Sequence, residues 1–134
     1  MLRALPLRLM PGDDLRGALE AAVAAHGCSA AFVLSGIGSL AATQLRLAGA
    51  EQACAIDGDV EILTLSGSVA GNGSHLHASV ADASGRVLGG HVAMGCTVRT
   101  TAEVLVALLP DWQFRREVDV ATGHAELVLH RPGT

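Results

Sequence analysis

The sequence contains no lysine and no tyrosine, and aromatic residues make up only 2% of it. All nine basic residues are arginines, set against thirteen acidic residues, so the formal net charge is −4. Proteins that bind nucleic acid usually present a basic stripe, and those that bind single strands add aromatic side chains on which bases stack. The composition therefore argues against a strong DNA-binding surface on a single copy of the chain.

The sequence also lacks a membrane-length hydrophobic run and any pair of closely spaced cysteines. Cys28, Cys54 and Cys96 form no C-x-x-C motif, and we expect reduced thiols, with Cys28 and Cys96 acting as small core residues. No stretch is long enough to span a bilayer, and the N-terminal residues lack the pattern of a secretory signal. These absences favour a cytoplasmic protein with no membrane segment.

Half of the 134 residues are hydrophobic, so we expect one domain, residues 1–134, with a core of alanine, valine, leucine and isoleucine. Helical spacing of apolar residues predicts a helix that Asp13 or Asp14 caps and Gly27 ends. Strand-like segments are predicted at 2–10, 30–34, 40–48, 60–69, 74–93 (a hairpin), 97–109, 114–120 and 125–130, with a turn at 35–39 and a loop at 49–59. The fold class is therefore α+β, a mostly antiparallel (mixed) sheet with one or two helices packed on it.

Gly36, Gly38 and Ala41 match the dinucleotide-binding pattern G-x-G-x-x-A. That pattern needs a strand before it and a helix after it. The residues that follow, 43–47, alternate like a strand instead. We interpret the glycines as part of a tight turn between strands, with no role in nucleotide binding.

Three histidines, His75, His77 and His91, lie on two strand-like segments joined by a short turn. Residues i and i+2 of a strand share a face, so His75 and His77 point the same way, roughly 6–7 Å apart at Cα. A type I turn over 82–84, followed by Gly85 in the left-handed conformation, gives a three-residue hairpin loop. Counting back from that loop places His91 opposite His77, with directly opposed Cβ atoms about 5 Å apart.

Three imidazoles on one sheet face suit a divalent metal, since three protein nitrogens and one open position hold a catalytic or ligand-binding zinc. The alternative is that these histidines only cap, pack or face solvent, and the pattern alone leaves both open. Gly89 and Gly90 remove side chains beside the cluster, which leaves space for a ligand or a neighbouring backbone.

The chain as a whole resembles the plants-and-prokaryotes conserved (PPC) domain family. The resemblance rests on the segments Gly36–Leu40, Glu61–Ser68, His75–His77, Gly85–His91, Thr101–Val104, Phe114–Arg116 and Thr122–Gly123. It implies an α+β fold, a homotrimer, and zinc bound by His75, His77 and His91. Prokaryotic members are often labelled DNA-binding, but this chain has no Arg-Gly-Arg-Pro hook of the plant type. The fold is also similar to that of acetolactate decarboxylase, a metal-dependent lyase.

Two functions follow, and the sequence leaves both open. The first is a trimeric binding or regulatory module with a small-molecule ligand at its metal. The second is a metal-dependent enzyme, which needs an acid or base, and Glu61 and Glu103 are candidates because each interrupts an apolar strand. Their alternative role is a salt bridge, to Arg116 or across a subunit interface. We interpret His124 and His130 as surface residues of the last strand.

Overall fold

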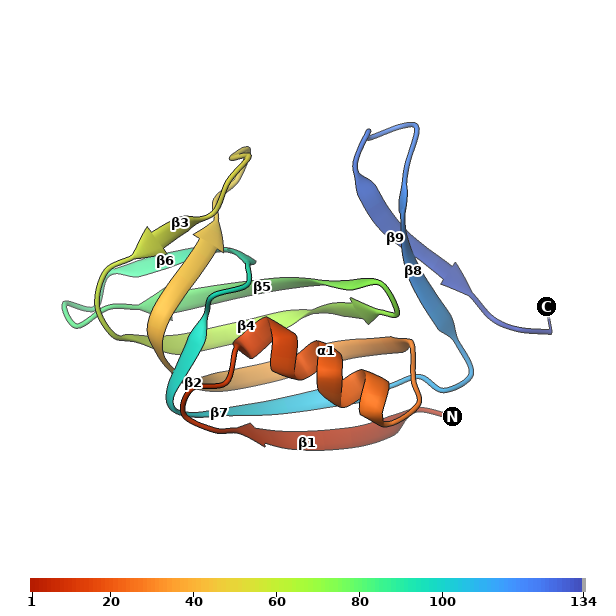
Figure 1. Ribbon diagram of the computed structural model, residues 1–134, viewed down its shortest axis with the longest axis horizontal. Helices are drawn as coiled ribbons and strands as arrows, with labels where there is room; N and C mark the ends of the chain where they lie inside the picture. The colour runs from red at the N-terminus through yellow and green to blue at the C-terminus, as the bar shows by residue number, and fades with distance from the viewer. Residues whose placement is uncertain (134) are drawn as a thin grey trace.

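The computed structural model describes residues 1–133, in which one helix packs on a mainly antiparallel sheet (Figure 1). The elements are β1 (Arg3–Leu9), α1 (Leu15–Ala25), β2 (Ala30–Arg46), β3 (Cys54–Ile56), β4 (Val60–Ala70), β5 (Gly73–Ala81), β6 (Val87–Val92), β7 (Thr97–Leu108), β8 (Gln113–Val118) and β9 (Ala125–His130). The main sheet has the order β1-β7-β2-β4-β5-β6, with β3 added to β2, while β8 and β9 form a separate hairpin. The predicted α+β class is confirmed, with a single helix in the described residues.

Helix α1 is defined by its cap and by one apolar stripe. The Asp14 carboxylate accepts a hydrogen bond from the backbone N of Gly17 at 2.8 Å, which satisfies a donor that the helix itself leaves free. Leu15, Leu19 and Val23 recur every four residues and are buried. Each such side chain contributes on the order of 1.5–3 kcal/mol when it is buried. This stripe packs α1 across one face of the sheet (Figure 1).

Strand β2 corrects the sequence prediction. Two strands, 30–34 and 40–48, with a turn at 35–39 were expected, but β2 runs through as one strand from Ala30 to Arg46. Pairing with β4 on one side and β7 on the other holds it extended, and register shifts against β7 take up its irregularities as bulges. Gly38 is needed for close packing rather than for a turn, since a Cβ there would lie 2.4 Å from the Thr101 carbonyl oxygen.

The far end of β2 bends away from β4 and closes the sheet onto its other edge. There it pairs with β3, a short strand within the predicted loop 49–59, and then with β6, where Arg46 lies opposite His91. Gly90 makes this approach possible, because a Cβ on Gly90 would lie 2.7 Å from the Arg46 carbonyl oxygen. The space left by this glycine is therefore filled by a neighbouring backbone.

The two faces of the sheet differ in cover. The face under α1 forms the core, and it is built from leucine, valine, isoleucine and alanine as predicted. On the opposite face the three central strands expose large apolar side chains, namely Leu34, Ile37, Leu63 and Leu105, which are 40–56% exposed. An antiparallel sheet often leaves one face in water, but that face is normally polar, so this apolar uncovered face, called here the open face, needs an explanation.

The β8–β9 hairpin projects away from the main sheet (Figure 1). Phe114 anchors it, being 2% exposed and in edge-to-face contact with Phe32 at 5.6 Å between ring centroids. Asn72 adds two hydrogen bonds to the backbone of Arg116, at 2.9 and 2.7 Å. The hairpin is therefore held at its base, and its register with the sheet is fixed at Arg116.

The fold shows how deeply each cysteine is buried and whether any helix could span a membrane. Cys96 is fully buried, Cys28 is half-buried against the core, and Cys54 is exposed, and all three are free thiols. Burial raises the pKa of the Cys96 thiol, as expected for an inert core residue. Among residues 1–133, no helix combines the length and the apolar character needed to cross a membrane.

We predict that Gly67→Ala destabilises the protein by about 1–3 kcal/mol more than Gly73→Ala, because it adds overpacking to backbone strain. The two glycines have nearly the same φ, 147° and 146°, so this angle disfavours alanine at both positions. Only at Gly67 would the new Cβ meet an atom, the His75 carbonyl oxygen at 2.0 Å. Urea unfolding measures the difference, and equal losses in the two variants would contradict it.

Candidate metal centre

The hairpin that carries the three histidines has the predicted loop. Gly85 adopts φ of 82°, and its backbone N donates to the Asp82 carbonyl oxygen at 3.0 Å. The Asp82 N then donates to the Arg86 carbonyl oxygen at 3.0 Å, which starts the β5–β6 ladder. That ladder places His77 opposite His91, as the turn predicts.

The three imidazole rings converge on one point. The Nε2 atoms of His75 and His77 lie 3.0 Å apart. The ring centroid of His91 lies 4.8 Å from that of His75 and 4.5 Å from that of His77. One ring nitrogen from each residue lies within 4.8 Å of the other two. His75 and His91 are half-buried, and His77 is exposed.

This donor set fits a divalent metal ion. Two nitrogens that bind one tetrahedral ion at about 2.0–2.1 Å are about 3.3 Å apart, close to the separation of His75 and His77. The His91 nitrogen lies within 4.8 Å of both. With three imidazole ligands and no thiolate or carboxylate, the cluster suits zinc, copper, nickel or iron and leaves at least one coordination position for a ligand.

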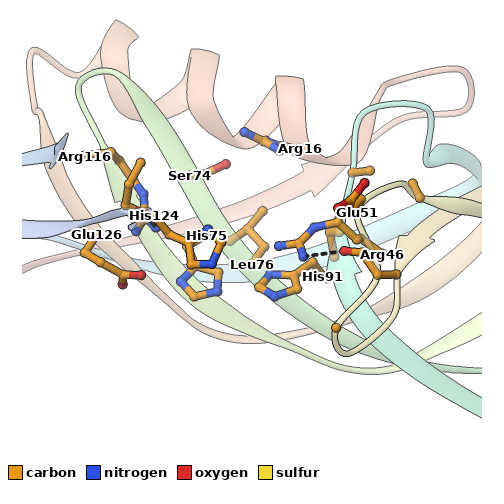
Figure 2. Close-up of a pocket in the computed structure, with 16 residues that line it drawn as sticks. Arg16, Arg46, Glu51, Ser74, His75, Leu76, His91, Arg116, His124 and Glu126 are labelled. Atoms are coloured by element: carbon orange, nitrogen blue, oxygen red, sulfur yellow. Dashed lines mark hydrogen bonds between the residues drawn. The ribbon is translucent and has the colours of Figure 1, made fainter. Parts of the chain in front are cut away.

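A pocket of about 920 Å³ opens beside His75 and His91. Figure 2 shows Arg46 next to His91 on one side, and Arg116 with Glu126 on the side of His75. The lining comes from α1, the end of β2, the β2–β3 loop, β5, β6 and the β8–β9 hairpin: Arg16, Arg46, Gly49, Ala50, Glu51, Ala53, Ser74, His75, Leu76, His91, Val92, Ala93, Arg116, His124, Ala125 and Glu126. Six separate segments of the chain therefore meet at the histidine cluster.

The surroundings of His75 and His91 favour the neutral form of the imidazole. Burial is the main cause that lowers the pKa of His75, followed by the charges of His77 and Arg116. Burial also comes first in lowering the pKa of His91, and Arg46 comes second. Neutral imidazole is the form that binds a metal, so these shifts favour a metal over a proton.

The predicted acid–base candidates lie elsewhere. Glu61 and Glu103 are exposed, lie outside the pocket and form no ion pair with Arg116 or any other residue among residues 1–133. Glu103 instead lies opposite Arg8 on β1. The apolar strands tolerate Glu61 and Glu103 because both carboxylates point to water.

Sequence reasoning missed the other polar residues of the pocket. His124 is exposed as predicted, but it precedes β9 and lines the pocket together with Glu126. Arg46 and Glu51 were also missed. Arg46 reaches the site only because β2 is continuous and pairs with β6, and no local pattern reveals that pairing.

Comparison with known proteins identifies related chains. Residues 1–110 match the model of the Plants and Prokaryotes Conserved (PCC) domain. The bifunctional protein GlmU of Synechococcus sp. (strain JA-3-3Ab) is 45% identical over 130 residues, which cover 97% of this chain and 21% of that protein. The chain therefore spans about a fifth of the length of this curated relative.

Solved structures share the whole fold. A hypothetical protein from Salmonella cholerae-suis is 37% identical with a TM-score of 0.93, covering 98% of this chain and 96% of that one. A metal-containing protein from Archaeoglobus fulgidus is 27% identical, with a TM-score of 0.80 and coverage of 94% and 93%. A Ralstonia eutropha structure with a provisional DNA-binding label is 26% identical, with a TM-score of 0.75 and coverage of 95% and 90%.

We predict that the metal-free protein loses stability as the pH falls below about 6.5. The folded pKa of His75 and of His91 lies below the ordinary value of 6.5. The unfolded chain therefore takes up protons first, and acidification favours unfolding. Urea unfolding of chelator-treated protein between about pH 7.5 and about pH 5.5 measures the slope. The double variant His75→Ala, His91→Ala should show a smaller slope, and an unchanged slope would refute the assignment.

Proposed function

The chain belongs to the Plants and Prokaryotes Conserved domain family, and we propose that it is a trimeric zinc-binding module of that family that recognises a small-molecule ligand at its metal. The observation that carries this proposal is the convergence of three imidazoles beside an open pocket. Bound zinc would act as a Lewis acid that polarises an oxygen of the ligand. His75, His77 and His91 would hold it.

The related chains support the metal part of the proposal. The Archaeoglobus fulgidus structure with the same fold is described as metal-containing. The donor set of this chain has the nitrogen-only composition that zinc accepts. The GlmU match covers about a fifth of that protein but almost all of this chain, which is consistent with a self-contained module.

We predict that untagged protein, prepared without a nickel column, contains about one zinc ion per chain, and that His77→Ala lowers this well below one. Removing one of three ligands leaves two, which is too few to hold the ion tightly. The matched control is His130→Ala, since His130 is exposed on β9 outside the cluster. Plasma mass spectrometry measures the zinc content of each variant. If the wild-type protein is isolated without metal and also fails to take up added zinc, the proposal is overturned.

The open face supports the trimer. Its apolar side chains on β2, β4 and β7 form a contiguous uncovered surface of the kind that marks protein–protein contacts. A second copy of the chain is the occupant that we propose, because the strands of one subunit can cover the open face of the next. His75 and His77 point to the side of the sheet away from the core, as the open face does, since they alternate with the buried Leu76. Subunit contacts and metal sites would therefore be neighbours.

Light scattering should therefore give about three times the chain mass of 13.6 kDa. Ile37→Glu, which places a charge in the open face, should shift the protein toward monomers. Met10→Glu is the control, because Met10 is 46% exposed, close to the 52% of Ile37, but lies outside that face. A wild-type monomer at micromolar concentration would rule out the trimer.

The DNA-binding label of related chains does not suit this protein, and we propose that it binds no duplex DNA tightly by itself. Affinity for DNA comes largely from neutralising phosphates. The chain carries a net charge of −4, which a trimer would multiply, so long-range electrostatics would repel the duplex. Arg115 and Arg116 form its only pair of adjacent basic residues.

We expect a dissociation constant weaker than about 1 µM for mixed-sequence duplex at physiological salt. A salt titration followed by fluorescence anisotropy measures it. Tighter binding with a slope of several ions, lost in the double variant Arg115→Gln, Arg116→Gln, would restore a DNA-binding function.

A further inference from the structure

Two arginines in the metal pocket have no acidic partner. Arg46 and Arg116 are half-buried and line the pocket on the sides of His91 and His75 (Figure 2). Arg46 donates one hydrogen bond to the Ala50 carbonyl oxygen at 3.1 Å. Arg116 donates one to the Ala125 carbonyl oxygen at 2.6 Å. Within residues 1–133, neither guanidinium forms an ion pair.

These backbone contacts orient the guanidinium groups without neutralising them. A guanidinium has five N–H donors, and each of these two uses one on a carbonyl. Arg16 differs, because it reaches the same pocket but is paired with Glu20 at 3.2 Å. The unpaired positive charge of the pocket is therefore concentrated in Arg46 and Arg116.

A bound metal would make the pocket positive in an acidic protein. Its carboxylates, Glu51 and Glu126, equal in number the two arginines without an ion pair, Arg46 and Arg116, so the lining itself is close to neutral. A divalent ion on the histidines would add two positive charges. Half-buried guanidinium groups bind carboxylates and phosphates through strong, charge-assisted hydrogen bonds.

The size and lining of the pocket limit the ligand. A volume of about 920 Å³ holds a small molecule. Apolar surface is added by the partly or fully exposed alanines of the lining, Ala50, Ala53, Ala93 and Ala125, which suits a carbon skeleton. We infer that the pocket takes a small organic anion that is held by Arg46 and Arg116 while one of its oxygens approaches the metal.

This inference rests on the metal site proposed above and names the chemical class of its ligand. The test uses the cobalt-loaded 134-residue chain, because the visible spectrum of cobalt changes when a ligand enters its coordination shell. The probes are lactate, its neutral amide lactamide, and hydroxymethylphosphonate. Lactate and lactamide have the same shape and differ in charge, and the phosphonate distinguishes a phosphate-type anion from a carboxylate.

We expect at least one of the two anions to bind about tenfold more tightly than lactamide, and Arg46→Gln and Arg116→Gln each to weaken that binding by about tenfold or more. Cobalt stoichiometry should stay unchanged in both variants. Arg46→Lys, which keeps the charge, should restore part of the affinity. Arg115→Gln is the control, because Arg115 adjoins Arg116 but lies outside the pocket and contacts Glu117.

The outcomes separate the two proposals. If cobalt binds but lactamide binds as tightly as both anions, the anion inference alone is overturned. The same holds if cobalt binds and the Arg46→Gln and Arg116→Gln variants keep full affinity for the anions. A wild-type protein that binds no cobalt overturns the metal site, and the inference falls with it. Tighter binding of lactate or of the phosphonate identifies the acidic group of the ligand, and either result supports the inference.

Discussion

The pairing of β2 with four other strands is the constraint on which the rest of the structure depends. Its first part lies between β4 and β7, and its end crosses to β6 at the other edge of the sheet. Without this crossing, β6 would be a free edge, and the strand that carries His91 would have one partner. The crossing places Arg46 beside His91, and it requires a residue without a side chain at Gly90. Metal site and sheet closure are therefore parts of the same arrangement.

Local signals were sufficient to predict the histidine cluster. The loop ending at Gly85 fixes the β5–β6 register, and that register alone places His91 opposite His77. The helix was predictable for a similar reason, because its cap and its apolar stripe both lie within a dozen residues. The contacts that define the hairpin and the helix join residues close together in the sequence, so the rules for turns and helices apply directly.

The parts that sequence failed to predict depend on contacts between distant segments. Gly36 and Gly38 favour a turn when they are considered alone, but flanking strands more than twenty residues away hold them extended. That error hid the path of β2 and so the position of Arg46. Arg116, His124 and Glu126 come to the pocket on a hairpin whose docking depends on Phe114 meeting Phe32, which no periodicity indicates.

The electrostatics of the site link its two proposed ligands. The charges of Arg46 and Arg116 help to lower the pKa values of His91 and His75, which removes protons that would compete with a metal. The same charges repel the metal that replaces those protons. In a half-buried pocket this repulsion is weakly screened. An anion that contacts both the guanidinium groups and the metal would convert the repulsion into attraction, so metal and anion should each raise the affinity of the other.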